Sequence, residues 1–290
     1  MKRVRKAVFP VAGLGTRMLP AAKTVAKEML TVVDRPLIDW VVAEARAAGI
    51  EHFILVTGRG KGAMEDYFDH HVELEATLAA KGKTALLDEI VRALPREGEI
   101  SYVRQMEPKG LGHAVWCARD IIGDEPFAVL LPDMIMDATP GCLAQAMAAY
   151  EQVGGGNIVV VEPCPPGEAH KYGIVALDNQ QGRIGRMTGM VEKPAPGTEP
   201  SNLFISGRYI LQPEIFDILE KGERGAGGEI QLTDGMATLM KSQAFHALEF
   251  DGTTYDCGDK IGWLRANVAM ALKDPKLADA ARAALRPLFD

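Results

Sequence analysis

A glycine-rich segment near the start of the sequence holds the first residues that could bind phosphate. It reads VAGLGTRMLPAAKTVAKEML over residues 11–30, where Gly13 and Gly15 are followed by Arg17 and later by Lys27. It fits neither the phosphate loop GxxxxGK[ST] nor the dinucleotide pattern GxGxxG before a helix. Glycines let a backbone approach a ligand and expose N–H groups to anionic oxygens. Arginine can donate to two phosphate oxygens, and lysine adds a compact positive charge. The segment therefore predicts contacts to several phosphate groups of one ligand.

The distribution of charge also favours a compact anionic ligand. The chain has 290 residues and a net charge of -7, which argues against a general nucleic-acid binder. No acidic residue precedes Glu28. Seven cationic residues do precede it: Lys2, Arg3, Arg5, Lys6, Arg17, Lys23 and Lys27. A small cationic region in an acidic chain suits a small phosphorylated molecule better than an extended polyanion.

Two aspartates are candidates for a divalent metal. Asp133 ends the apolar stretch FAVLLPD, and Asp256 lies in TYDCGD after the predicted strand FHALEF. A magnesium ion on nucleotide phosphates typically takes one or two protein carboxylates, so the pair would suffice. Taken singly, either aspartate could instead cap a turn or a helix.

The segment MVEKP at 190–194 places an acid and a base side by side at the end of an apolar stretch. Because neighbouring strand residues face opposite ways, Glu192 and Lys193 are not expected to pair with each other. Lys193 could bind a second phosphate and Glu192 sugar hydroxyls. The alternative is that both are edge-strand charges that oppose aggregation.

No common catalytic machinery accompanies these residues. The sequence lacks GxSxG and HExxH, and Asp69, His70 and His71 are better explained as a solvated surface than as a metal site. If the nucleophile is an already ionised phosphate oxygen, no general base is needed. Catalysis then depends on metal, positive charge and alignment.

The elements that position these residues alternate between short apolar stretches and helical patterns, which predicts an α/β fold with a mostly parallel sheet. Strands are predicted at 5–13, 50–58, 99–105 and 126–133, the last ending at Asp133. Helices are predicted at 36–49, about 64–94 and about 144–153. Closely spaced strands at 157–163, 172–178, 183–194 and 203–211 predict an antiparallel extension. The last part returns to helix, strand and helix, and no linker divides residues 1–290, so a single domain is expected.

Four cysteines, at positions 117, 142, 164 and 257, show no metal or disulfide spacing, which predicts reduced thiols. No apolar run approaches the roughly 18 residues that would span a bilayer. The N-terminal segment lacks a cleavage-like site for secretion. The expected location is cytoplasmic, with no membrane or nucleic-acid partner.

The chain resembles the bacterial UTP–glucose-1-phosphate uridylyltransferases, within the sugar-phosphate nucleotidyltransferase superfamily. The resemblance spans nearly the whole sequence. It rests on these stretches: GLGTRMLPAAKTVAKEML, VVDRPLI, VRQMEPKGLGHAV, PFAVLLPD, YGIV, VEKP, GRYIL, GGEIQLTD and YDCGDKIGWLRANVAMAL. It implies a Rossmann-like mixed sheet flanked by helices. It further implies transfer of the uridylyl group of UTP to glucose 1-phosphate with Mg²⁺, and a homodimer or homotetramer.

The resemblance also implies a role for each site residue. The uracil pocket would comprise the backbone of Ala12 and Gly13, with Gln105 and Gly110 or Gly112. Arg17 and Lys27 would hold the triphosphate, and Asp133 and Asp256 the magnesium. Gly173 and Glu192 would bind glucose, and Lys193 the phosphate of glucose 1-phosphate. Ala22, Ala26 and Thr31 differ from the residues that are usual in the family at these positions. The last two replace prolines, which leaves the backbone of the loop less restricted.

Three other functions are open. A relative using dTTP or another sugar phosphate would differ in only a few contacts to base and sugar. A nicotinamide-dependent oxidoreductase would need an acid about 20 residues after the glycine turn. Asp34 lies near that distance, but its surroundings, TVVDRPL, lead into a helix. A non-catalytic relative should have lost a charged site residue, and none is lost.

Overall fold

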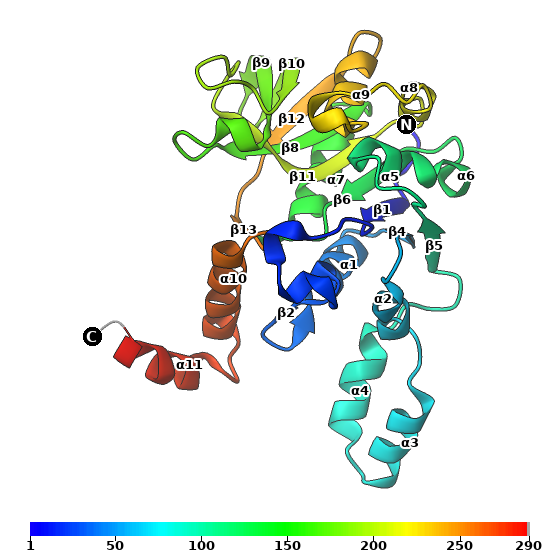
Figure 1. The fold of residues 1–290 in the computed structure, drawn as a ribbon, viewed down its shortest axis with the longest axis vertical. Helices are drawn as coiled ribbons and strands as arrows, with labels where there is room; N and C mark the ends of the chain where they lie inside the picture. Colours follow the sequence, from blue (N-terminus) through cyan, green and yellow to red (C-terminus); the bar gives the residue numbers. More distant parts are fainter. Residues whose placement is uncertain (289–290) are drawn as a thin grey trace.

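One large sheet forms the centre of the molecule (Figure 1). The computed structural model describes residues 1–288. In sheet order the strands are β5 (Ile100–Arg104), β4 (His52–Thr57), β1 (Lys6–Pro10), β6 (Phe127–Leu130), β11 (Leu203–Leu211), β8 (Asn157–Pro163), β12 (Phe245–Glu249), β10 (Ile184–Glu192) and β9 (Gly173–Gln181). Two small sheets pair β13 (Thr253–Asp256) with β7 (Met134–Asp137) and β2 (Thr31–Val32) with β3 (Arg35–Pro36).

The large sheet has a parallel part and an antiparallel part. Strand β1 pairs in parallel with β4 and β6, and β4 with β5. Strand β11 runs antiparallel to β6 and β8, while β10 runs antiparallel to both β9 and β12. The predicted α/β fold with an antiparallel extension is therefore confirmed. In the parallel part, the carboxyl ends of β1, β4, β5 and β6 share one edge, where ligands bind in such sheets.

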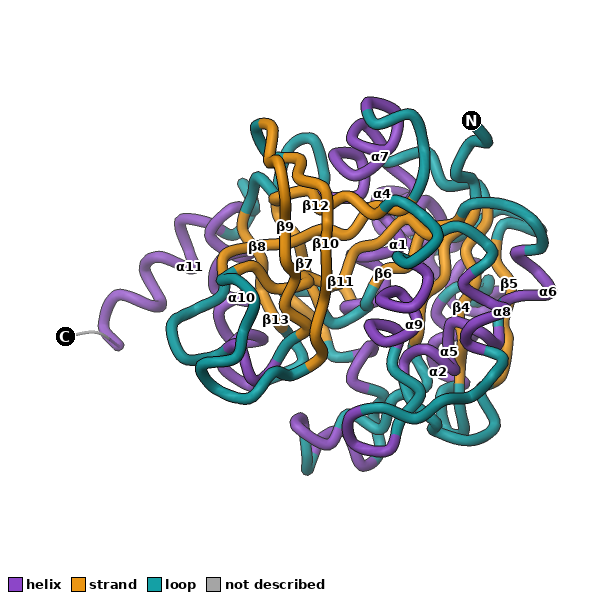
Figure 2. Tube along the Cα trace, turned by 90° about the horizontal axis from the view of Figure 1, so that it is seen from above, coloured by secondary structure: helices purple, strands orange, loops and turns teal. Residues whose placement is uncertain are grey.

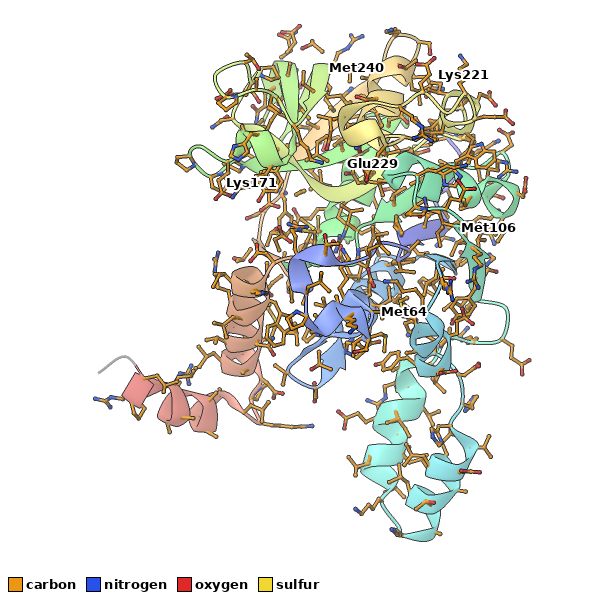
Figure 3. All side chains as sticks on the ribbon, viewed as in Figure 1. Met64, Met106, Lys171, Lys221, Glu229 and Met240 are labelled. Carbon is orange, nitrogen blue, oxygen red and sulfur yellow. The ribbon has the colours of Figure 1, made fainter. Side chains whose placement is uncertain are left out.

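Helices cover both faces of the sheet because its strands alternate buried side chains between two apolar clusters. On β1, Ala7 and Phe9 belong to one cluster and Val8 to the other. The first cluster includes α1 (Leu37–Ala47), α2 (Gly62–Tyr67) and α7 (Cys142–Gln152). The second includes α5 (Leu111–Cys117), α6 (Arg119–Ile122), α8 (Ile215–Leu219) and α9 (Leu232–Leu239). Side chains fill the space between the layers (Figure 3).

Two helical segments extend from this body. The pair α3 (Val72–Ala80) and α4 (Thr84–Ala93) projects beside α2 (Figure 1). Near the C-terminus, α10 (Lys260–Lys273) packs on a third apolar cluster with the two small sheets, and α11 (Ala278–Leu285) points away from the body in Figures 1 and 2. Short 3₁₀ turns are η1 (Thr16–Met18), η2 (Ala21–Lys23), η3 (Lys27–Met29), η4 (Ala169–Lys171), η5 (Ala226–Gly228) and η6 (Arg286–Leu288). Over the described residues, no helix combines the length and apolar character needed to cross a membrane.

Two predicted elements were wrong. The helix expected at about 64–94 is three helices, because Phe68–His71 and Lys81–Lys83 leave the helical conformation and Gly82 has a φ of 65°. The strand expected to end at Asp133 ends at Leu130. Pro132 has no N–H to continue the ladder, so pairing stops before it. Asp133 therefore lies in a short turn between β6 and β7.

A buried arginine fixes that turn. Arg208, on β11, is fully buried and donates to the Glu44 carboxylate from Nη2 at 2.8 Å. It also donates to the carbonyl oxygens of Leu131 at 3.0 Å and Met134 at 2.8 Å. These two carbonyls flank Asp133, so Arg208 holds the backbone on either side of it.

We expect Arg208→Met to lower the free energy of unfolding by about 3 to 5 kcal/mol, because the Glu44 charge would remain buried without its partner. Urea denaturation would measure the change. Arg282→Met, which removes an exposed pair to Asp279, is the control and should change it by less than about 1 kcal/mol. Equal, small effects for both variants would contradict this account of the buried pair.

Candidate active site

The glycine-rich segment lies at the carboxyl end of β1, as expected from the sheet. Ala12 packs against Gly58, which follows β4; a Cβ at Gly58 would be 3.3 Å from the Ala12 carbonyl oxygen. Gly15 adopts a φ of 66°, and a Cβ there would be 3.2 Å from the Cβ of Lys27. A Cβ at Gly13 would be 4.0 Å from the Lys27 Cε. The two predicted glycines thus lie directly against the predicted phosphate-binding lysine.

Gln105 begins the loop after β5 and is buried. Its Nε2 donates to the Gly110 carbonyl oxygen at 3.1 Å and lies 3.0 Å from His113 Nδ1. Because a carbonyl oxygen can only accept, the amide nitrogen must face Gly110. Burial and Lys109 lower the pKa of His113, so its neutral ring can accept at Nδ1. Within residues 1–288, Gln105 Oε1 has no hydrogen-bond partner and is free to accept from a ligand.

Gly110, which precedes α5, and Gly112, on α5, pack against the extended segment before α9. Gly112 donates its N–H to the Ile230 carbonyl oxygen at 2.8 Å, and Ile230 donates to Lys109 at 2.7 Å. A Cβ at Gly110 would lie 2.7 Å, and one at Gly112 2.9 Å, from that Ile230 oxygen. Gly110 also has a φ of 108°, which disfavours other residues. Both glycines are therefore required for this close approach.

Four charged side chains meet next to the glycine loop. The Lys27 ammonium forms a short ion pair with Asp133. Arg17 Nη1 lies 3.6 Å from Asp256 Oδ2. A Cβ at Gly258 would lie 2.7 Å from Arg17 Nη2 and 2.8 Å from an oxygen of each aspartate. All four predicted residues are therefore close together, with two carboxylates directed at one point.

The small sheet of β7 and β13 brings Asp256 to this point. In its antiparallel register, Asp256 pairs with Met134, the residue after Asp133. Cys257 donates its N–H to the Asp133 carbonyl oxygen at 2.8 Å, and Asp256 Oδ1 accepts from the N–H of Gly258 at 2.8 Å. The two aspartates are distant in the sequence, but the backbone of each is bound to the residue next to the other.

The carboxylates of Asp133 and Asp256 fit a divalent cation. Burial and the charge of Asp133 raise the pKa of Asp256, and the adjacent Arg17 only partly opposes this. Burial also works to raise the pKa of Asp133, but Lys27 and Arg17 overcome it and hold that pKa below its usual value. A divalent cation between two such carboxylates would remove their mutual repulsion, and oxygen donors are what magnesium prefers. Among the residues described, no third His, Cys, Asp or Glu joins them, which leaves room for phosphate ligands.

A second group of residues forms around the start of β9 and the end of β10. Gly173 pairs with Glu192 in the antiparallel register. Thr233, on α9, donates from Oγ1 to Glu192 Oε2 at 2.8 Å. A Cβ at Gly173 would lie 3.1 Å from Glu192 Oε2 and 3.3 Å from Thr233 Oγ1. The predicted sugar-binding pair is thus together, and a hydroxyl group that was not predicted completes it.

One sequence interpretation of Glu192 and Lys193 was wrong. They were not expected to pair, yet Lys193 Nζ lies 3.5 Å from Glu192 Oε1. The reason is that β10 ends at Glu192 and Lys193 takes a φ of 48°, so strand alternation no longer applies. At this end β10 is paired on one side only, as the edge-strand alternative requires, because β9 pairs with it as far as Glu192 whereas β12 pairs only with Ile184–Arg186.

Tyr172 lies between the two groups. It precedes Gly173, and its carbonyl oxygen accepts the N–H of Lys193 at 3.0 Å. Burial raises the pKa of Tyr172 to about 12, and the Asp256 carboxylate contributes to the rise while Arg17 opposes it. The sugar-binding group therefore adjoins the charged group through this residue.

Several site residues were not predicted. Thr233 and Glu28 lie inside stretches that carried the resemblance, so their motifs were visible although their roles were not. His113 also lies in such a stretch, beside Gly112. Lys61, which contacts Glu28 at 2.7 Å, lies in GRGKGAM, where no spacing distinguishes it from a surface lysine.

Known proteins resemble this chain along nearly its whole length. The sequence pattern of the nucleotidyl transferase family matches residues 6–271. UTP–glucose-1-phosphate uridylyltransferase of Bacillus subtilis strain 168 is 51% identical over 280 residues, 96% of this chain and 95% of the relative. A UTP-bound UGPase from Acinetobacter baumannii superposes with a TM-score of 0.89 at 43% identity, covering 97% of this chain and 98% of that one. A UDP-glucose pyrophosphorylase complexed with UDP-glucose has a TM-score of 0.82 at 40% identity, covering 93% and 99%.

Proposed function

The chain belongs to the nucleotidyl transferase family. From this premise we propose which of its residues binds each part of the two substrates during uridylyl transfer. The enzyme transfers the uridylyl group of UTP to glucose 1-phosphate, giving UDP-glucose and pyrophosphate. The observation that supports the division best is the convergence of Arg17, Asp133 and Asp256 around Gly258, with Lys27 paired to Asp133. Such a site suits a triphosphate and its cation.

In the proposed reaction, a phosphate oxygen of glucose 1-phosphate attacks the α-phosphorus of UTP. A new P–O bond forms as the bond to the bridging oxygen breaks, and pyrophosphate leaves with that electron pair. Because the attacking oxygen is already ionised, no general base is required. Arg17 and Lys27 bind the triphosphate and stabilise charge on its oxygens, while Lys193 aligns the sugar phosphate. Glu192 and the open backbone of Gly173 accommodate the sugar.

Enzymes of this family generally use a divalent metal, and we propose Mg²⁺, held by Asp133 and Asp256. When bound, it would neutralise charge on the phosphate oxygens. The carboxylates themselves keep Arg17 and Lys27 in place beside the glycine loop.

Gln105 is proposed to select the base. With Nε2 committed to Gly110 and His113, the free Oε1 can accept the N3–H of uracil, which cytosine lacks. Gln105→Leu should raise the dissociation constant for UTP about 10- to 100-fold, the range for one lost buried hydrogen bond. It should also narrow the preference for UTP over CTP, measured as a ratio of kcat/KM values. If the variant kept its affinity for UTP and its preference for UTP over CTP, Gln105 would not bind the base.

The substrates themselves can be tested with the purified protein and magnesium. Pyrophosphate release would be measured for UTP, dTTP, ATP and GTP against the 1-phosphates of glucose, galactose and N-acetylglucosamine. We expect the highest kcat/KM with UTP and glucose 1-phosphate. The highest kcat/KM with another pair of substrates would indicate a relative with a different specificity. No pyrophosphate release with any pair, while UTP still binds, would favour a non-catalytic protein.

We also propose that residues 1–290 act as one domain and that the chain forms a homodimer or homotetramer. One sheet contributes to both the nucleotide and the sugar groups, which supports the single domain. Apolar side chains are exposed on the projecting helices, which supports self-association: Val72, Leu74, Leu86, Ile90, Val91, Ile261 and Leu264. Light scattering on the purified protein would give the molar mass, and a monomer at micromolar concentration would contradict this proposal.

A further inference from the structure

A buried ion pair next to the site has no assigned role. Glu28, on η3 directly after Lys27, is fully buried, and its Oε2 accepts from Lys61 Nζ at 2.7 Å. Lys61 precedes α2 and is only 7% exposed. Removing two charges from water is costly, and apolar residues of similar size are often at least as stabilising as a buried pair. Stability alone therefore does not explain why these two residues are charged.

Apolar packing joins the two elements that carry this pair. Met64, on α2, is fully buried and belongs to the same apolar cluster as the partly buried Ala26 and Met29. Figure 3 shows Met64 where α2 meets the segment that follows β1. Two elements far apart in the sequence are thereby held together, one carrying Lys61 and the other Lys27 and Glu28.

The second oxygen of Glu28 lies near Lys27, a proposed triphosphate-binding residue. Oε1 is buried and has no hydrogen-bond partner in the described part of the chain. Lys27 Nζ lies 3.9 Å from it, while the same ammonium is ion-paired with Asp133. Burial raises the pKa of Glu28, and the charges of Lys27 and Lys61 oppose the rise. The Lys27 ammonium is thus located between two carboxylates, one of which has an unused acceptor.

This arrangement matters because Asp133 has a second proposed partner, the divalent cation. An oxygen that binds a divalent cation has less capacity to accept from Lys27. Glu28 Oε1 is then the acceptor within reach that can retain the ammonium beside the glycine loop. Lys61 occupies the other oxygen and so fixes which side of the carboxylate faces Lys27.

We propose that Glu28, oriented by Lys61, is a positioning residue that holds the Lys27 ammonium at the triphosphate site when Asp133 is engaged elsewhere. The proposal rests on the proposed function of Lys27. It assigns to the buried pair an effect on nucleotide binding and turnover in addition to any effect on stability.

The double variant Glu28→Gln with Lys61→Met tests the proposal. It removes both charges while nearly preserving side-chain volume, so the fold should be retained. We expect its thermal midpoint to stay near that of the unaltered protein. Its dissociation constant for UTP, measured calorimetrically with Mg²⁺ and without glucose 1-phosphate, should rise about tenfold. Its kcat should fall about 10- to 100-fold, as is typical when the partner that orients a site residue is lost.

A matched double variant, Arg35→Met with Asp39→Asn, is the control. It removes another ion pair with a buried carboxylate, at 2.6 Å, in which no proposed site residue takes part, and both readouts should stay within about twofold. If the Glu28–Lys61 double variant also binds UTP and turns over within twofold of the unaltered protein, the pair is only structural and the proposal is overturned.

A conservative variant decides the question should the double variant not fold. Glu28→Asp keeps the charge and retracts it by one methylene group from Lys27. We expect a lower kcat with an unchanged KM for glucose 1-phosphate, and full activity would overturn the proposal. Failure of the proposed function would be recognised separately. The unaltered protein would then make no UDP-glucose, while UTP binding in the presence of Mg²⁺ would still compare the variants.

Discussion

Asp133→Asn is expected to lower UDP-glucose formation about 100- to 1000-fold at saturating substrates, the range for losing one fixed charge contact to a transition state. It should also raise the Mg²⁺ concentration needed for half-maximal rate. The amide is a weaker metal ligand than a carboxylate, and it deprives the Lys27 ammonium of its nearest anion. Initial rates over a magnesium titration would measure both effects.

Asp137→Asn is the control for this substitution. Asp137 ends β7, close in sequence to Asp133, but it is partly exposed and pairs with Lys273 on α10. Its rate and magnesium dependence should stay within about twofold, since exposed ion pairs contribute little. If Asp133→Asn left the magnesium titration unchanged, Asp133 would not belong to the metal site.

Lys193→Ala is expected to abolish measurable turnover while UTP still binds. Lys193 lies with Glu192 and Thr233, apart from the pairs that hold Arg17 and Lys27. Its loss should therefore lower kcat/KM for glucose 1-phosphate by about 100-fold or more, through lost alignment of the attacking phosphate. Calorimetry should find the dissociation constant for UTP within about twofold of the unaltered value.

Lys171→Ala is the matched control, because the Lys171 side chain is 50% exposed, as is that of Lys193, and it also pairs with a glutamate. Figure 3 labels it near the same end of the antiparallel strands. Turnover should be nearly unchanged. A Lys193→Ala protein that lost UTP binding but kept its affinity for the sugar phosphate would reverse the division of the site proposed above.

The main elements could be predicted because their sequence signals are local. The apolar stretch at 50–58 predicts β4, and the pattern at 36–49 predicts α1. The errors arose where one residue interrupts a long pattern. Pro132 ends the ladder of β6 before Asp133, and Gly82 separates α3 from α4. Hydrophobic periodicity reports burial and does not report which backbone hydrogen bonds continue.

The site residues that could be predicted are those that follow the carboxyl ends of strands. The carboxyl ends of β1, β5 and β6 meet at one edge, which brings Gly13, Gln105 and Asp133 together. By contrast, the pairing of Glu192 with Lys193 depends on a positive φ at a lysine. The buried contact of Lys61 with Glu28 depends on how α2 packs against η3. Neither feature leaves a signal in residue type or spacing.

The central claim is that Asp133 and Asp256 together hold the divalent cation while Arg17 and Lys27 contact the triphosphate. Crystals grown with UTP and Mn²⁺, which scatters anomalously, would test it directly. We predict an anomalous peak bound by both carboxylates and by phosphate oxygens, with the Arg17 and Lys27 side chains on those phosphates. A metal bound by phosphate alone, with Lys27 still paired to Asp133 and Arg17 to Asp256, would contradict the claim.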